Sequence, residues 1–305
     1  MFIIKHKKIF IGISIILVVL SFVSLFVFGL KIGIDFKGGA LMEVTYTGVR
    51  PAQADVVTAL ETLNLGSVSV QPTGDTGYII KSRDLTEAEH GLILKSISNG
   101  GQNPLEEKSF NSIGPSVGKE LASKAVMAII LVSLAIICFI AFAFRKVSKP
   151  VSSWRYGIIA VVTLLHDVAI PIGVFTLLSH FKGVEVDTLF VVAVLTVLGL
   201  SVSDTIVVFD RIRENLKNRV STSFNETVGK SLEQSYVRSI CTSLTVILVL
   251  LSLFFFGPVS TKYFALMLTA GMFFGTYSSI FLASPLLVLV EEWQVKKQAK
   301  KKGKK

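Results

Sequence analysis

The sequence of 305 residues has few charged residues, cysteines and histidines. Charged residues make up 17%, whereas a soluble globular chain usually has about a quarter. The two cysteines, Cys138 and Cys241, both lie in apolar runs, so they offer neither a disulfide framework nor metal-ligand spacing. The four histidines are scattered, without an HExxH motif. The sequence therefore predicts neither a disulfide scaffold nor a metal site.

Motifs of nucleotide-driven and nucleophilic chemistry are also missing. The sequence contains neither a Walker A loop nor a nucleophile elbow. We therefore expect no enzymatic activity, no cofactor and no nucleic-acid partner. If the protein does work, its energy must come from elsewhere than a nucleotide bound to this chain. An ion gradient is the expected source, since one charge crossing 100 mV is worth about 2.3 kcal/mol.

Long apolar runs are what the sequence has instead. Hydrophobic residues make up 51% of the chain and the mean hydropathy is +0.66. Each run approaches or exceeds the roughly 20 residues that a membrane-spanning helix needs. Pro285 is expected to kink or end the last run. The six predicted spans are about residues 9–30, 126–144, 156–179, 188–209, 239–257 and 262–290.

The first run follows Lys5-His-Lys-Lys8, which resembles the basic start of a signal peptide. The run is longer than 20 residues and no small-residue cleavage site follows it, so we interpret it as an uncleaved anchor. The N-terminus and this anchor form the predicted segment 1–30. The other predicted segments are an outer domain at 31–125, a five-helix bundle at 126–290 and a basic cytoplasmic tail at 291–305.

Lysine and arginine placement predicts the orientation. The short loops on the predicted outer side contain only Lys182 and Lys262. Both termini are therefore expected in the cytoplasm. The inner segments contain, besides the C-terminal lysines, Lys5, Lys7, Lys8, Arg145, Lys146, Lys149, Arg155, Arg211, Arg213, Lys217, Arg219, Lys230 and Arg238.

The outer segment has the pattern of a small α+β domain. Its predicted strands and helices alternate in the order β-α-β-β-α-β, which is typical of a ferredoxin-like domain. Thr86, with Glu89 three residues later, predicts a capping box at the start of the second helix. The predicted strands are 41–47, 68–71, 78–81 and 106–113, and the predicted helices are 51–63 and 86–97.

Two cytoplasmic segments are predicted outside the spans. Residues 211–237 form a polar loop in which Ile212, Leu216 and Val228 recur among charges. Parts of this loop are therefore expected to lie at the membrane surface as an amphipathic helix. The tail Lys296–Lys305 is expected to be disordered. It would attract anionic membrane lipids by about 1 kcal/mol for each cation near the surface.

Asp204 lies inside the fourth apolar run, where a carboxylate costs roughly 2.5 to 3.5 kcal/mol on insertion scales. It could bind and release a proton, or it could hydrogen-bond to a serine of a neighbouring span. We favour the proton, because ionisable residues within membranes mark ion pathways. Gly199 and Ser203 would leave room around it for a moving helix or a water chain.

Other residues in the spans indicate a functional role less clearly than Asp204 does. Asp167 is equally well explained as a relay member and as a structural hydrogen-bond acceptor. His166 has less weight, because a lone intramembrane histidine is more often a packing donor. Arg238, taken alone, is best explained as a cytoplasmic anchor. Gly271 and Gly275, followed by Ser279 and Ala283, form a small face that lets helices approach closely.

The segment after the first span contains Gly33, Asp35, Phe36, Gly38 and Gly39. The two adjacent glycines suit a tight turn into the outer domain. We therefore prefer a hinge and cap here over a ligand-binding site.

Four stretches resemble one known family. They are Gly33-Ile-Asp-Phe-Lys-Gly-Gly39, Ile113-Gly-Pro-Ser-Val-Gly118, Leu165-His-Asp-Val168 and Ser201–Asn215. In this order they resemble the SecD/SecF family of bacterial protein-export membrane proteins, in its smaller, SecF branch. The family is a branch of the resistance-nodulation-division (RND) superfamily.

This resemblance implies a function and roles for particular residues. It implies a multi-pass protein of the bacterial inner membrane that uses the proton motive force to promote late steps of export. Asp204 matches the proton-pathway aspartate of the family and Arg238 matches a conduction-related arginine. Ser239, Thr242 and Ser243 would carry water beside that arginine.

The resemblance also implies partners. A SecD-like subunit would supply the other half of a twelve-span assembly, next to a SecYEG channel with YajC and YidC. The substrate would be a translocating unfolded polypeptide.

Two alternatives remain at this stage. An RND-type half-transporter for a lipid or small amphiphile is disfavoured, because an outer segment of about 95 residues is small for a substrate vestibule. A passive scaffold would tolerate loss of the Asp204 charge.

Overall fold

The computed structural model describes residues 2–143 and 151–302. The predicted cytoplasmic cations Arg145, Lys146 and Lys149 lie outside the described residues. The chain divides into two compact units. The first consists of Met1–Lys31 and Ala128–Lys305, and the second is Ile32–Met127.

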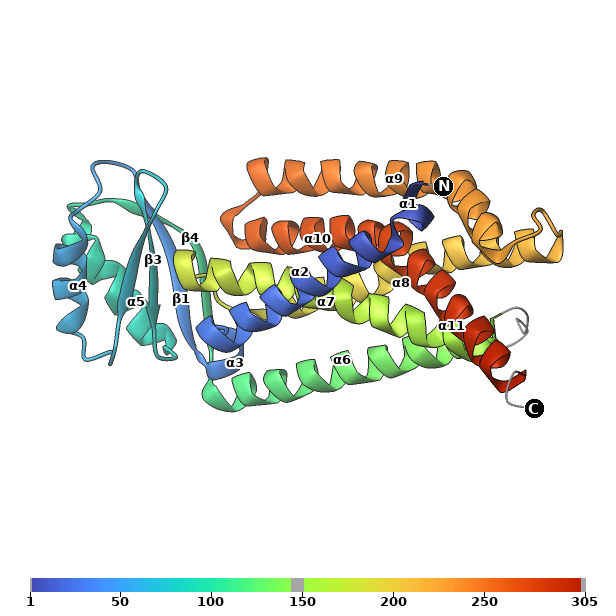
Figure 1. Ribbon diagram of the computed structural model, residues 1–305. Helices are drawn as coiled ribbons and strands as arrows, with labels where there is room; N and C mark the ends of the chain where they lie inside the picture. Colours follow the sequence, from blue (N-terminus) through green and yellow to red (C-terminus); the bar gives the residue numbers. More distant parts are fainter. Residues whose placement is uncertain (1, 144–150, 303–305) are drawn as a thin grey trace. The chain divides into compact units, whose positions relative to one another are not determined.

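The elements that the structure describes in the first unit are all helices (Figure 1). Six helical stretches of the described chain are long and apolar enough to cross a membrane. This confirms the prediction of a polytopic helical membrane protein. Its helices are α1 (Phe2–Lys5), α2 (Lys7–Phe28), α7 (Ser153–Lys182), α8 (Thr188–Lys217), α9 (Phe224–Phe256), α10 (Val259–Ser278), the π-helical turn η2 (Ser279–Ala283), α11 (Ser284–Lys302) and most of α6 (Pro115–Ala143).

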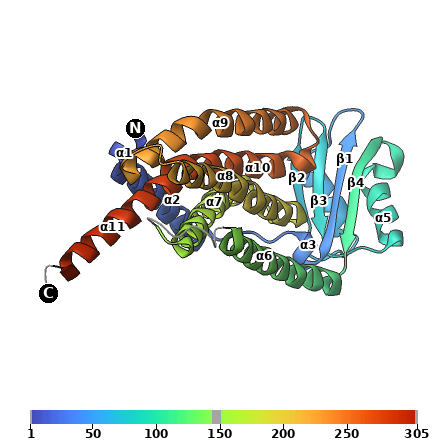
Figure 2. The same ribbon diagram turned by 90° about the vertical axis from the view of Figure 1, so that its right-hand side faces the viewer.

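The helices differ in how deeply they are buried. In the most apolar 18-residue stretch of each helix, 56% of the residues are buried in α7 and 44% in α8, but only 17% in α2 and in α9. Helix α10 packs against α7, α8 and α9, and α2 packs against α7 (Figures 1 and 2). Helices α7, α8 and α10 therefore form the centre of the bundle, where α7 carries Asp167 and α8 carries Asp204.

Small residues allow the close contacts in the bundle. A methyl group added at Gly271 of α10 would lie 2.1 Å from Val197 Cγ2 of α8. One added at Gly275 would lie 3.3 Å from Ser201 Cβ. Between α7 and α2, one added at Gly173 would lie 2.5 Å from Ser21 Cβ of α2. Such contacts drive helix association where lipid offers no hydrophobic gain.

Several helices extend beyond the predicted spans. The polar loop predicted at 211–237 is shorter than expected, because α8 continues to Lys217 and α9 begins at Phe224. Its helical parts are therefore continuations of the two neighbouring spans. Ile212 and Val228 are fully buried in this hairpin, so side-chain packing continues where hydrophobicity along the chain declines. The hydroxyl of Ser223 caps α9 by accepting a hydrogen bond from Glu226 N at 3.2 Å.

The last predicted span, 262–290, is divided into α10 and α11 by η2. Pro285 is the second residue of α11, immediately after this π-helical turn. Proline has no backbone N–H to donate, and a local change of helical pitch accommodates that loss. The predicted disordered tail is helical as far as Lys302, so that prediction is wrong for Lys296–Lys302.

The second unit contains a four-stranded antiparallel sheet with the order β2-β3-β1-β4. Helices α4 and α5 pack against it around a core that includes Val44, Leu60, Ile80 and Ile93 (Figure 1). The hydroxyl of Thr86 and the side chain of Glu89 form a capping box at the start of α5. The elements are α3 (Ile34–Lys37), β1 (Gly39–Tyr46), α4 (Gln53–Glu61), β2 (Ser69–Thr73), β3 (Gly77–Ser82), α5 (Glu87–Ile97), the short 3-10 helix η1 (Asn99–Gly101) and β4 (Leu105–Ile113).

Candidate functional site

Asp204 is half-buried at the contact of three helices. Its Oδ2 atom accepts a hydrogen bond from Thr276 Oγ1 of α10 at 3.2 Å and another from Ser243 Oγ of α9 at 3.5 Å. These two hydroxyls also contact each other. The carboxyl of α8 is thus linked to both neighbouring helices, while part of it stays accessible.

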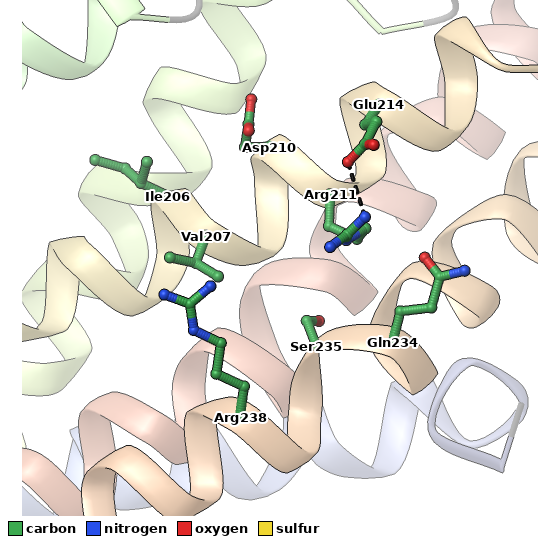
Figure 3. Close-up of a pocket in the computed structure, with 8 residues that line it drawn as sticks. All are labelled: Ile206, Val207, Asp210, Arg211, Glu214, Gln234, Ser235 and Arg238. Carbon is green, nitrogen blue, oxygen red and sulfur yellow. Dashed lines mark hydrogen bonds and ion pairs between the residues drawn. The ribbon is translucent and has the colours of Figure 1, made fainter.

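A pocket of about 240 Å³ lies between α8 and α9, and its first lining residue, Ile206, is two residues after Asp204. Its volume is sufficient for several water molecules, each of about 30 Å³ in the liquid. Six of its eight lining residues have polar or charged side chains. The residues that line it are Ile206, Val207, Asp210, Arg211, Glu214, Gln234, Ser235 and Arg238 (Figure 3).

Arg238 differs from the neighbouring arginines in its lack of an ion-pair partner among the described residues. Arg211 pairs with Glu214 at 2.8 Å and Arg213 with Asp210 at 3.6 Å. Arg238, by contrast, makes no hydrogen bond or ion pair with any residue that the structure describes. Its guanidinium group extends from α9 toward α8 at Val207 (Figure 3). The guanidinium of Arg238 therefore lies at the pocket beside Asp204 without a partner among the described residues.

Asp167 is fully buried and forms a second polar cluster. Its Oδ1 atom lies 2.7 Å from Nδ1 of His166. Its Oδ2 atom accepts hydrogen bonds from Ser278 Oγ at 2.6 Å and from Ser201 Oγ. Nε2 of His166 is buried without a partner among the described residues. Asp167 thus connects α7 to α8 and α10.

The other predicted site residues are more scattered. Ser239 is buried, and its carbonyl accepts a hydrogen bond from Ser243 Oγ at 2.8 Å, which places Ser239 one turn from the Asp204 contact. Gly199, Ser203 and Thr242 are exposed on their helices. A methyl group added at Gly199 would meet no atom within 4 Å, so Gly199 allows no close helix contact within the described part of this chain.

Sequence reasoning missed the hydroxyl donors Thr276 and Ser278. Both are on α10, one and three residues after Gly275, but neither belongs to the small face that the sequence predicted. A hydroxyl next to a small face in a span is the signal that would have found them. Their partners cannot be read from one helix, because each donor is 72 or 111 residues from its acceptor.

The glycine segment before β1 forms a tight contact within the second unit. Gly33 caps α3, which contains Asp35 and Phe36. Gly38 has φ +82°, and a methyl group added there would lie 2.8 Å from Pro115 Cα. Gly39 has φ +137°. These glycines let the chain enter β1 directly beside the first turn of α6, which is a packing role.

Within the described residues, no three or more histidine, cysteine or acidic side chains gather in a way that could hold a metal ion. The polar groups of the bundle include the two carboxyls with their hydroxyl donors, the buried imidazole of His166 and the exposed guanidinium of Arg238. This arrangement is suited to holding and releasing a proton. Fold and site together define a class: a polytopic membrane protein with ionisable groups inside its helix bundle.

Comparison with known proteins identifies the family. Residues 93–293 match the family "Protein export membrane protein SecD/SecF, C-terminal". Residues 23–48 match the "SecD/SecF GG Motif". The chain therefore belongs to the SecD/SecF family, as its motifs indicated.

Curated relatives are similar over nearly their whole length. "Protein translocase subunit SecF" of Thermobaculum terrenum is 43% identical over 302 residues, covering 94% of this chain and 92% of the relative. The protein of the same name from Anaerolinea thermophila is 36% identical over 296 residues, covering 96% and 95%.

A solved structure is also similar. It is that of SecDF, a translocon-associated membrane protein from Thermus thermophilus, with a TM-score of 0.78 and 28% identity. The match covers 95% of this chain and 38% of the SecDF chain. This chain therefore corresponds to a part of that longer protein.

Proposed function

We propose that this protein is an accessory subunit of the Sec protein translocase that uses the proton motive force to promote late steps of export. The name and coverage of its SecF relatives support the translocase assignment. The observation that supports proton coupling is the Asp204 carboxyl, held inside the bundle by hydroxyls of two other helices. Beside it lies a pocket lined in part by Arg238, which has no ion-pair partner among the described residues.

In this proposal, Asp204 binds and releases a proton. When it is neutral, its contacts with Thr276 and Ser243 are ordinary hydrogen bonds between uncharged groups. When it is ionised, the carboxylate attracts the guanidinium of Arg238, which is always charged. The Arg238 side chain can then move along the pocket, and this movement would change the packing of α8 against α9. One proton crossing 100 mV supplies about 2.3 kcal/mol for that change.

The proposal includes an orientation and a partner. Both termini are in the cytoplasm of a bacterium, and the second unit is an extracytoplasmic domain of ferredoxin-like fold. Lysine and arginine placement supports the orientation, and the sheet order β2-β3-β1-β4 supports the fold. A SecD-like chain completes the membrane assembly, which the longer SecDF chain supports. SecYEG, YajC, YidC, the exported polypeptide and membrane lipids are its proposed contacts.

The experiment compares Asp204→Asn with wild type in inverted membrane vesicles containing the partner and the channel. Export rate is measured with an imposed pH gradient, with a sodium gradient alone and with neither. Asp204→Asn keeps the shape and removes the charge. It should abolish the stimulation by the pH gradient, whereas the protein should still insert and co-purify with its partner.

The matched control is Asp55→Asn, the same chemical change on the exposed surface of α4. It should leave the stimulation unchanged. Wild-type stimulation in Asp204→Asn would refute proton coupling through this carboxyl. If a sodium gradient alone stimulates export by the wild type, sodium and not the proton is the coupling ion.

A further inference from the structure

Asp167 is the most deeply buried acidic group that the proposed function does not use. Its side chain is fully buried. Three donors converge on it, from His166 of its own helix, Ser201 of α8 and Ser278 of α10. A buried carboxyl with all its donors in place is rigidly held, and Asp167 is not among the residues that line the pocket beside Asp204.

The donors of Asp167 lie next to the site of Asp204 in sequence and in space. Ser201 is three residues before Asp204 on α8, and Ser278 is two residues after Thr276 on α10. By holding both serines, Asp167 fixes α8 and α10 relative to each other. Gly275 supports this contact, because a methyl group added there would lie only 3.3 Å from Ser201 Cβ.

This fixed register brings Thr276 Oγ1 to 3.2 Å from Asp204. A shift of α10 by 1.5 Å, roughly the rise of one residue, would break that hydrogen bond. We propose that Asp167 is a positioning residue, which sets the hydroxyl donor of Asp204 through Ser201 and Ser278 and carries no proton in transport. The inference rests on the proposed role of Asp204.

Asparagine provides a sharp test, because it can reproduce all three contacts without a charge. Both serines bind the same oxygen, Oδ2, and an amide oxygen has two lone pairs for them. The amide nitrogen would then donate to Nδ1 of His166, which accepts when the ring carries its proton on Nε2. An amide cannot bind and release a proton as a carboxyl does. Asp167→Asn therefore separates positioning from proton transfer.

The groups that face Asp204 define what a pH profile would report. They are the hydroxyls of Thr276 on α10 and Ser243 on α9, the charge of Arg238 on α9, and the pair of Asp167 and His166 on α7. Loss of the Thr276 hydroxyl in Thr276→Val changes the hydrogen bonding of Asp204 directly. A change that only misplaces Thr276 should alter the pH profile of export in the same direction.

The experiment measures gradient-driven export in vesicles across a range of pH for four variants. Asp167→Asn should stay within about threefold of the wild-type rate, less than the effect of losing one hydrogen bond. The double variant Ser201→Ala/Ser278→Ala removes no charge and should lower the rate roughly tenfold, since two hydrogen bonds are lost. Its pH profile should shift in the same direction as that of Thr276→Val. Asp204→Asn is the inactive reference.

The other possible results would overturn either this inference or the proposed function. If Asp167→Asn is as inactive as Asp204→Asn while it still inserts and pairs with its partner, Asp167 carries a proton and the inference is overturned. A double serine variant with the wild-type rate and pH profile also overturns it. If the double variant fails to insert, Ser278→Ala alone is compared with Thr276→Val on the same criterion. An active Asp204→Asn refutes the proposed function itself, whatever Asp167→Asn does.

Discussion

The contact between Gly271 and Val197 gives a prediction that rests on shape alone. A methyl group at Gly271 would lie 2.1 Å from Val197 Cγ2, 2.9 Å from Cγ1 and 3.1 Å from Cβ. Ordinary contact begins near 3.4 Å, so the closest approach is about 1.3 Å too short. Rotation of χ1 cannot relieve it, because valine is branched at Cβ and is restricted to one main rotamer in a helix. Gly271→Ala must therefore push α10 away from α8.

The expected cost follows from the size of this clash. Overpacking a tight contact costs about 1–3 kcal/mol, partly offset by up to about 1 kcal/mol from the better helix propensity of alanine. We expect Gly271→Ala to lower the melting temperature of the protein in nanodiscs. We also expect weaker gradient-driven export, because Val197 is on α8, the helix that carries Asp204.

Two other glycines of the same bundle are matched controls. A methyl group at Gly275 requires Ser201 to move by only a few tenths of an ångström, so we expect Gly275→Ala to lower the melting temperature less than Gly271→Ala does. Gly199→Ala meets no atom within 4 Å and should be neutral or slightly stabilising. Adding Val197→Ala should rescue Gly271→Ala, with a coupling energy of about 0.5–3 kcal/mol in the double-mutant cycle. Equal melting temperatures for Gly271→Ala and Gly199→Ala, or no coupling, would refute the reasoning.

Two further predictions concern the second unit and are measured in the intact 305-residue chain. A hydrogen bond from Arg83, together with those from Thr86, lowers the pKa of Glu89 to about 2; this stabilisation is present above the ordinary value of 4.5 and is lost as pH falls through the folded value. Arg83→Gln should therefore raise the Glu89 pKa in carbon NMR of labelled protein, and an unchanged titration would contradict it. Gly38→Ala should speed amide exchange in β1 more than Gly100→Ala does, because both have positive φ but only Gly38 would also clash with Pro115. Equal exchange in the two variants would count against the contact.

Much of the membrane architecture was predictable because hydropathy is a local property. A run of apolar residues long enough to cross hydrocarbon specifies a helix wherever its neighbours lie. The capping box of Thr86 and Glu89 is equally local, since both partners lie within one turn. Asp204 stood out for the same reason, as a charge in an apolar run.

The ends of the helices were less predictable. Hydropathy declines after Phe209, yet α8 continues to Lys217 because Ile212 and Asn215 are buried against α9. A helix can continue past the end of its apolar run, because its backbone hydrogen bonds do not require apolar side chains. The tail from Lys296 was misjudged in the same way, because helix α11 continues through a sequence whose composition alone suggests disorder.

The sequence by itself determined that this chain crosses a membrane several times and carries carboxyls where lipid disfavours them. Only the tertiary structure decided which hydroxyls contact those carboxyls. Helices α7 and α10 are apolar on nearly every side, so no periodicity indicates which face meets which neighbour. Thr276 reaches Asp204, Ser278 reaches Asp167, and Gly199 reaches nothing in the described chain because of how three helices pack. That packing depends on side-chain shapes from distant parts of the chain, which no single stretch of sequence contains.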